Sequence, residues 1–167
     1  DQVRALIDLV ERTELNAIVV DVKGDRGWLA YPSQVPLAQE LGVAIGGLMD
    51  IREFLRLCKE RGIYTIARLV IFKDSPLAFG HPELAVTNAD GTVWTDAKGA
   101  GWANPFRQEV VDYNIAIAVE VAQMGFDEIQ VDYVRFPSDG DVTTIAYEEA
   151  ENTMENRTAA INGFLER

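Results

Sequence analysis

The sequence contains very little cysteine and histidine. Cys58 and His81 are the only residues of their types among 167. A single cysteine excludes an intrachain disulfide, and a lone histidine is a poor signal for a metal site. We therefore predict neither a metal ion nor another cofactor.

Basic residues and long apolar runs are also scarce. The chain has 15 Lys and Arg residues against 27 Asp and Glu residues, which gives a net charge of −12. Such a charge repels nucleic-acid backbones and anionic membrane surfaces. No uninterrupted apolar run approaches the roughly 20 residues that cross a bilayer. We predict no nucleic-acid partner and no membrane insertion, while neutral or cationic ligands stay open.

The composition that is present, 48% hydrophobic and 25% charged, is typical of a globular domain, and we assign residues 1–167 to a single domain. The apolar residues recur at helical or strand spacing in alternating segments. We predict helices at 1–14, 49–62, 107–125 and 147–166, and strands at 16–23, 63–74 and 126–137. This order calls for an α/β fold with parallel strands joined by right-handed crossovers.

One connection is unusually long. Residues 75–106 exceed an ordinary connector, which indicates a functional loop or subdomain. The Asp-Gly turn in "NADGTVW" predicts a small β-hairpin there. Three strands make a thin sheet, and the chain begins and ends on a helix. We therefore predict a partial (β/α)8 TIM barrel, a section that lacks the first strand and the later half.

Charged side chains occur where the predicted strands end. Asp21 and Lys23 share one face by alternation, Arg68 lies between two apolar neighbours, and Asp132 ends the third strand. The C-terminal ends of parallel strands form the functional site in barrels and in open sheets. If these faces point into one barrel, two cations and two carboxylates converge there. Each charge on its own could equally be solvated or form a structural ion pair.

A cluster of this kind suits the chemistry of sugars. Glycosidases hold two carboxyl groups around an oxocarbenium-like transition state. We assign the nucleophile or charge stabiliser to Asp132, with Asp21 as a second catalytic carboxylate beside it. Lys23 and Arg68 would keep Asp132 ionised and contact the substrate. Further substrate contacts are predicted from aromatic faces and one amide, namely Trp28, Tyr31, Trp102, Tyr133 and Asn104. For the tryptophans, packing in the core is the competing interpretation.

Two blocks resemble a known family. "HPELAVTNADGTVWTDAKGAGWANPFRQEVVDYNIAIAVEVAQMGFDEIQVDYVRFPSDG" at 81–140 and "VVDVKGDRGWLAYPS" at 19–33 are similar to a family of bacterial glycoside hydrolase domains, first catalogued as uncharacterised and distantly related to α-amylases. The resemblance implies a (β/α)8 barrel that acts on a polysaccharide or oligosaccharide, and an extracellular or cell-envelope location. Asp132 corresponds to the amylase nucleophile, but Gln130 stands where amylases have arginine. The general acid would lie on a later strand, outside this chain.

Two other functions compete with a glycosidase. One is a non-catalytic carbohydrate-binding module or inactive hydrolase relative of the bacterial envelope. The other is a Schiff-base enzyme that uses Lys23. This hypothesis is weaker, because nearby carboxylates favour the charged ammonium over the free amine that the reaction needs.

Two structural expectations accompany these functions. Exposed edges of a three-stranded sheet predict self-association. Arg135 should leave the sheet and hydrogen-bond the turn at 138–141, without pairing with Asp132.

Overall fold

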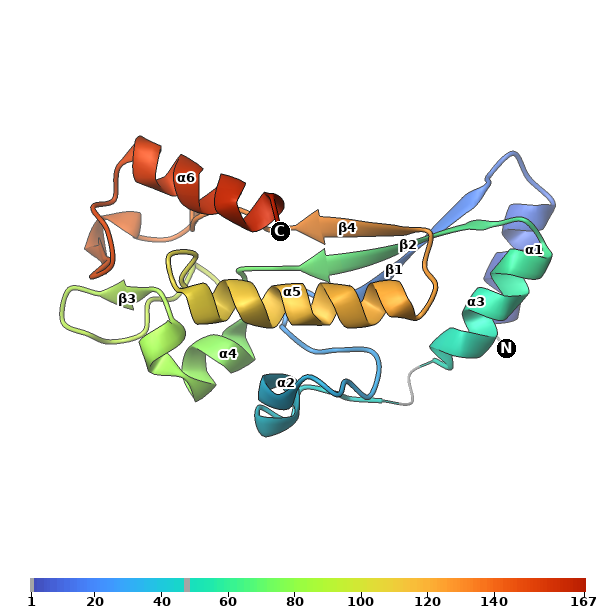
Figure 1. The fold of residues 1–167 in the computed structure, drawn as a ribbon, viewed down its shortest axis with the longest axis horizontal. Coiled ribbons are helices and arrows are strands. Elements are labelled where there is room, and N and C mark those ends of the chain that lie inside the picture. The colour runs from blue at the N-terminus through green and yellow to red at the C-terminus, as the bar shows by residue number, and fades with distance from the viewer. Residues whose placement is uncertain (1, 47–48) are drawn as a thin grey trace.

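Three parallel strands form the central sheet of the computed structural model, which describes residues 2–46 and 49–167. They are β1 (Ala17–Lys23), β2 (Tyr64–Val70) and β4 (Glu128–Asp132), in the order β1-β2-β4. Both neighbouring pairs run parallel, so all three C-terminal ends lie at one edge (Figure 1). The predicted α/β order with parallel strands is confirmed.

Helices alternate with these strands along the chain. The three longer helices that precede the strands are α1 (Gln2–Glu11), α3 (Ile51–Glu60) and α5 (Gln108–Gln123), and α5 lies along the sheet (Figure 1). The shorter elements are α2 (Pro36–Glu40), α4 (Ser75–Gly80), η1 (Pro82–Leu84) and η2 (Val142–Thr144). Residue 1 of the first predicted helix lies outside the described residues. Every helix in the described ranges is too short or too polar to span a bilayer.

The ends of α3 follow from its sequence. The side chain of Asp50 accepts a hydrogen bond from the Glu53 N–H at 3.1 Å, which satisfies a donor that the first helical turn leaves free. Gly62, with φ of 67°, allows the chain to leave the helix. Cys58 is buried, as its place on the apolar face predicts.

The last helix starts later than its periodicity suggests. Helix α6 (Met154–Leu165) begins after Thr153, whose side chain caps the N–H of Asn156 at 3.2 Å. The predicted start at residue 147 is therefore wrong. Tyr147 instead packs edge-on against Phe106, with ring centroids 5.1 Å apart, which fixes this segment as a loop.

The long excursion after β2 contains α4, η1 and a small hairpin. Thr87 bridges Val93 in antiparallel fashion, and the N–H of Gly91 bonds to the Asn88 carbonyl at 2.9 Å, so the predicted hairpin is confirmed. Strand β3 (Thr87–Asn88) also pairs with β5 (Ile145–Ala146). That second pairing joins segments nearly 60 positions apart, and local sequence patterns carry no signal for it.

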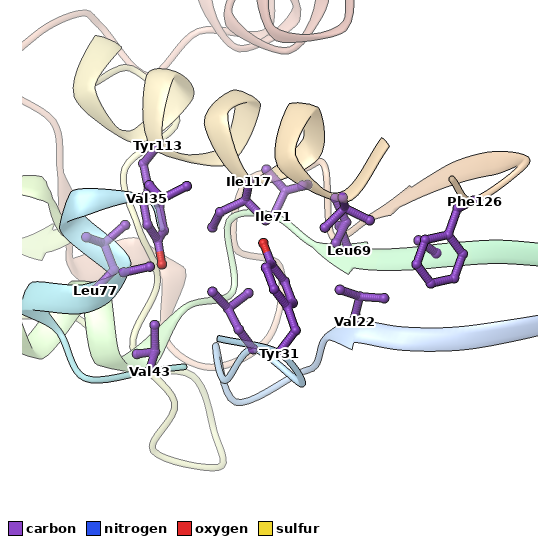
Figure 2. Close-up of a cluster of buried hydrophobic side chains, with 14 of the residues drawn as sticks. Val22, Tyr31, Val35, Val43, Leu69, Ile71, Leu77, Tyr113, Ile117 and Phe126 are labelled. Atoms are coloured by element: carbon purple, nitrogen blue, oxygen red, sulfur yellow. The ribbon is translucent and has the colours of Figure 1, made fainter. Parts of the chain in front are cut away.

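The two faces of the sheet differ in burial. Val22 and Leu69 are fully buried beneath Ile117 of α5, and each such side chain contributes about 1.5–3 kcal/mol (Figure 2). Val19, on the other face, is 51% exposed. The open face is the one on which Arg68 lies.

A bulge moves Lys23 to the buried face. Asp21 pairs with Arg68 and Lys23 with Leu69, and the register shifts between these two pairs. A one-residue shift reverses the face of every later side chain in a strand. Lys23 therefore joins Leu69 in the core, and the prediction that it shares a face with Asp21 is wrong.

Candidate active site

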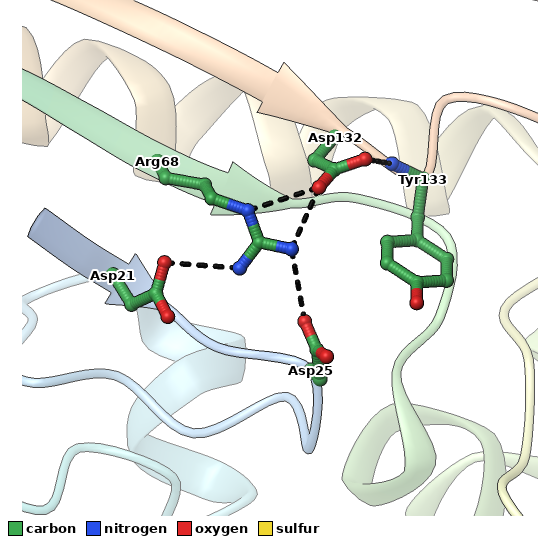
Figure 3. A network of polar contacts seen from close by, with 5 residues as sticks. All are labelled: Asp21, Asp25, Arg68, Asp132 and Tyr133. Atoms are coloured by element: carbon green, nitrogen blue, oxygen red, sulfur yellow. Dashed lines mark hydrogen bonds and ion pairs between the residues drawn. The ribbon is translucent and has the colours of Figure 1, made fainter. Parts of the chain in front are cut away.

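Arg68 is the centre of an ion-pair cluster at the C-terminal ends of the strands. Its Nε and Nη2 donate to Oδ2 of Asp132 at 2.9 and 2.6 Å (Figure 3). Nη1 donates to Asp21 at 2.9 Å, and Nη2 also reaches Asp25 at 3.0 Å. One guanidinium thus connects β1, the turn after it, and β4.

Strand register explains this convergence. Asp21 lies opposite Arg68 in the β1–β2 pair, and Asp132 pairs with Val70, one side-chain step further along the same face. The expected meeting of Asp21, Arg68 and Asp132 is present, while their catalytic roles stay predictions. Sequence reasoning missed Asp25, because the "GDRG" segment was interpreted only as a turn. A carboxylate directly after a strand was the available signal.

Asp132 is held ionised. Two hydrogen bonds from Arg68 lower its pKa below the usual value, against partial burial, and the Tyr133 N–H adds a bond to Oδ1 at 2.7 Å. For Arg68, burial favours the neutral form, but its hydrogen bonds to the carboxylates outweigh this effect and raise the pKa. The side chain of Asp132 is 41% exposed against 18% for Arg68, so the carboxylate is the more accessible partner of this pair.

The cluster can stabilise positive charge. Three carboxylates surround one guanidinium, so the group is anionic overall and presents acceptors for hydroxyl groups. Across residues 2–46 and 49–167, no three His, Cys, Asp or Glu side chains are arranged to hold a metal ion. The arrangement suits a neutral, hydroxyl-rich ligand that develops positive charge as it reacts.

Lys23 lies outside this cluster. Its ammonium is fully buried, pairs with Asp74 at 2.7 Å, and donates to Asn114 at 2.8 Å and to the Ile71 carbonyl at 3.3 Å. It also lies 5.2 Å from the centre of the Tyr113 ring. A buried ammonium cannot contact a sugar, so the predicted substrate contact is wrong. A carbonyl substrate cannot reach this buried amine, so Lys23 cannot form a Schiff base with it.

Two predicted aromatic platforms belong to the core. Tyr31 is 4% exposed and Trp102 is 1% exposed, so neither ring offers a face to a ligand. The Tyr31 hydroxyl donates to Glu120 on α5 at 2.7 Å, which anchors the loop after β1. Burial and this bond raise the pKa of Tyr31. Trp28, in contrast, is 42% exposed beside the Asp25 turn and stays available.

Asn104 has a structural role rather than an open amide. It is 4% exposed, donates to Glu149 at 2.9 Å, and accepts from the Phe106 N–H at 3.0 Å. These two bonds fix the entry into α5, and the predicted substrate contact from Asn104 is wrong because its amide is already used.

Arg135 behaves largely as the sequence predicts. It leaves the sheet and donates to the Ser138 hydroxyl and to the Phe136 carbonyl at 3.4 Å. Its guanidinium lies 5.1 Å from the ring centres of both Trp102 and Tyr133. Within the described residues it forms no ion pair with Asp132, so the site cation is Arg68.

The chain is an α/β domain with a cluster of carboxylates and one arginine at the C-terminal ends of its parallel strands. The chain belongs to the family described as "Putative glycosyl hydrolase domain", which it matches over residues 1–167. The family resemblance inferred from the sequence is therefore confirmed. No curated protein matches the chain.

Solved structures agree with this assignment. A hypothetical protein from Ruminiclostridium thermocellum ATCC 27405 is 35% identical, with a TM-score of 0.88 over 99% of this chain and 83% of that one. The α-galactosidase TtGalA from Thermus thermophilus is 16% identical, with a TM-score of 0.61 over 99% of this chain and 31% of the enzyme. An α-L-fucosidase from Paenibacillus thiaminolyticus is 17% identical, with a TM-score of 0.64 over 98% and 25%. The chain thus spans a third or less of these two enzymes, and the likeness to them concerns the fold.

Proposed function

We propose that this domain is part of a glycoside hydrolase that cleaves O-glycosidic bonds in a polysaccharide or oligosaccharide. Asp132 is the nucleophile or charge stabiliser, and Asp21 is the second carboxylate of the site. The observation that carries this proposal is the half-exposed Asp132 carboxylate, kept ionised by Arg68 at the open ends of parallel strands. Family membership supports it.

The proposed reaction needs two groups, Asp132 and a general acid that lies outside residues 1–167. An oxygen of Asp132 attacks the anomeric carbon, or stabilises its positive charge, as the bond to the leaving sugar breaks. The leaving oxygen takes a proton from a general acid on a later strand, beyond this chain. In the retaining mechanism, water then attacks the anomeric carbon, the bond to Asp132 breaks and releases its carboxylate, and the deprotonated acid group takes the proton of the water.

The same proposal includes a (β/α)8 barrel of which these residues form a section. The face with Val19 and Arg68 would become the interior of the barrel, and the helices already cover the outer face. The exposure of Val19 supports this, because an apolar side chain that is open to water in this section would be buried by the other strands of a closed barrel. An envelope or extracellular location is part of the proposal through the family resemblance.

A non-catalytic carbohydrate-binding domain is the second candidate. Both oxygens of Asp132 already accept hydrogen bonds, which favours a structural carboxylate over a free nucleophile. The exposed ring of Trp28 could still stack on a sugar.

Reducing-sugar release by the full-length protein separates the two candidates. With bacterial exopolysaccharides and peptidoglycan as substrates, Asp132→Asn should abolish release, because the amide cannot carry the negative charge. Glu128→Gln removes a carboxylate from the same strand at its opposite end and should keep wild-type activity. Glycan binding that survives Asp132→Asn, with no turnover by the wild type, would establish the binding module instead.

Self-association is the further expected property of residues 1–167 expressed alone. In the central sheet β1 and β4 each have β2 on one side. Apart from the bridge between Lys23 and Leu29 at the end of β1, no strand of the described residues covers their outer edges, which therefore offer unpaired backbone groups. Sedimentation velocity should show a sedimentation coefficient that rises with concentration. A monomer with a sharp, concentration-independent unfolding transition would contradict the section-of-a-barrel proposal.

A further inference from the structure

His81, the single histidine of the sequence, has a carboxylate next to each of its ring nitrogens. Nδ1 lies 2.9 Å from Oε1 of Glu83, and Nε2 lies 3.2 Å from Oε1 of Glu40. A neutral imidazole has a proton on one nitrogen only, so it can donate to one of these carboxylates and presents a lone pair to the other. Both contacts are favourable only when the ring carries two protons and a positive charge.

The two carboxylates belong to different connections of the fold. Glu40 ends α2, in the connection that follows β1, whereas Glu83 lies in η1, within the excursion that follows β2. Both connections start at the C-terminal edge of the sheet, and the first of them also carries Asp25 of the Arg68 cluster. His81 therefore joins two segments that leave the sheet beside the candidate site.

The backbone around this contact is held on both sides. The N–H of His81 donates to the Leu77 carbonyl at 2.9 Å, and its own carbonyl accepts from the Leu84 N–H at 2.8 Å. The end of α2 touches the end of α4 at Gly80, where an added Cβ would lie 2.5 Å from Cδ2 of Leu41. The imidazole side chain is 23% exposed. The position of the ring is thus set by the fold, and its charge is what can change with pH.

The two glutamates favour the charged form of the ring. The hydrogen bond to Glu83, together with the negative charges of Glu83 and Glu40, raises the pKa of His81 above its usual value, against partial burial. These glutamates are the only charged residues of α2, α4 and η1, and the charge of Arg107 acts on Glu83. Because folding raises the pKa, the contact stabilises the fold fully below about pH 6.5, where an unfolded histidine is protonated. This contribution is lost as the pH rises through the pKa of the folded state.

We propose that His81 is a pH-sensitive clasp between the connection that follows β1 and the excursion that follows β2. The charged ring donates from both nitrogens and holds α2 against the end of α4. When the ring loses one proton, Glu83 keeps its hydrogen bond from Nδ1, because it lies two positions away on the same segment, and the contact with Glu40 is released. The two connections can then separate at this point. An effect on sugar release rests on the proposed glycosidase function, whereas the clasp does not.

The test begins with the charge of the ring. The full-length protein is labelled with 13C in its histidine rings, and the His81 signal is identified by its loss in His81→Gln. Its pKa should lie above the ordinary value of about 6.5. Glu40→Gln and Glu83→Gln, which remove one charge each, should both lower it, whereas Glu60→Gln, on α3 beside Arg56, should leave it unchanged. A His81 titration that Glu40→Gln does not move would overturn the proposal, because the ring would then be bound within its own segment only.

Hydrogen–deuterium exchange measures the release of α2. At pH 5.5 the backbone amides of residues 39–42 should exchange about twofold to fivefold more slowly in the wild type than in His81→Gln, the range expected from one exposed ion pair. At pH 9 the two proteins should exchange at the same rate, since the wild-type ring is then neutral. Comparing the two proteins at one pH cancels the intrinsic pH dependence of exchange.

A permanent cation at the same position gives the matched control. His81→Arg stays charged at pH 9 and should keep these amides protected there, because a guanidinium can donate to both carboxylates. Equal exchange in the wild type and His81→Gln at pH 5.5 would overturn the proposal. So would a wild-type protection, relative to His81→Gln, that is as large at pH 9 as at pH 5.5. If the clasp opens as expected but the wild type releases no sugar, the clasp stands and the glycosidase function fails.

Discussion

Lys23→Met should lower the free energy of unfolding by about 3–5 kcal/mol at pH 7, the range found when one partner of a buried ion pair is removed. Lys23 and Asp74 are both fully buried and lie 2.7 Å apart. Without the ammonium, Asp74 keeps one hydrogen bond, from the Leu77 N–H, and its charge is uncompensated in the core. Asn114 loses the donor for its side-chain oxygen as well. Since domains are stable by about 5–15 kcal/mol, this loss is a large share of the total stability.

Urea denaturation monitored by circular dichroism measures this effect. Lys59→Met, on the exposed surface of α3, removes the same side chain and should change stability by less than about 0.5 kcal/mol. The double variant Lys23→Met/Asp74→Asn should recover much of the loss, because neither partner then leaves a buried charge. A double variant as unstable as the sum of the two singles would show that the cost comes from packing.

Arg68→Leu should reduce kcat/KM by about 100-fold in the proposed glycosidase reaction, comparable to the loss of one preorganised donor in other enzymes. The variant leaves Asp21, Asp25 and Asp132 close together without their shared cation. In the wild type Arg68 lowers the pKa of Asp132, so the carboxylate is ionised well into the acid range. Without it the pKa rises, and the acid limb of the pH–kcat/KM profile should move to higher pH.

Two further variants complete this experiment: the conservative substitution Arg68→Lys and the control Arg56→Leu. Arg68→Lys keeps the positive charge but loses the planar fork of donors. Compared with Arg68→Leu, its acid limb should lie closer to the wild-type pH, while its kcat/KM should stay low. Arg56→Leu removes an exposed arginine that pairs with two carboxylates, Glu53 and Glu60. It should change neither kcat/KM nor the pH of the acid limb. An acid limb that stays in place in Arg68→Leu would show that Arg68 does not set the ionisation of Asp132.

Local sequence signals located most of the fold. Period-two apolar runs gave the three strands, and the Asp50 cap with Gly62 bounded α3 because capping is decided within a few residues. The Asp-Gly turn predicted the hairpin for the same reason. The start of α6 was misplaced because the segment at 147–153 has helical composition but is held as a loop by aromatic contacts from elsewhere, including Phe106.

The candidate site was predictable in part. Alternation along regular strands placed Asp21, Arg68 and Asp132 on one face, and their meeting required only that the strands be parallel. Alternation failed at Lys23, because a bulge is a property of the paired strands and leaves no mark in the β1 sequence. It also could not tell buried rings from exposed ones, so Tyr31 and Trp102 were mistaken for platforms. The ring of Trp28 is exposed, and its substrate contact stays a prediction.

Local periodicity and composition set the class of fold, the order of strands and helices, and the charged residues at the strand ends, and the blocks at 19–33 and 81–140 carried the family resemblance. The tertiary structure alone decided which charges share a partner. In the folded chain Arg68 forms ion pairs with three aspartates, and Lys23 forms one with Asp74. Tyr133 takes a left-handed backbone conformation there. The physical reason is that burial, strand register and close contact between distant segments set these interactions, and none of them is written in the spacing of neighbouring residues.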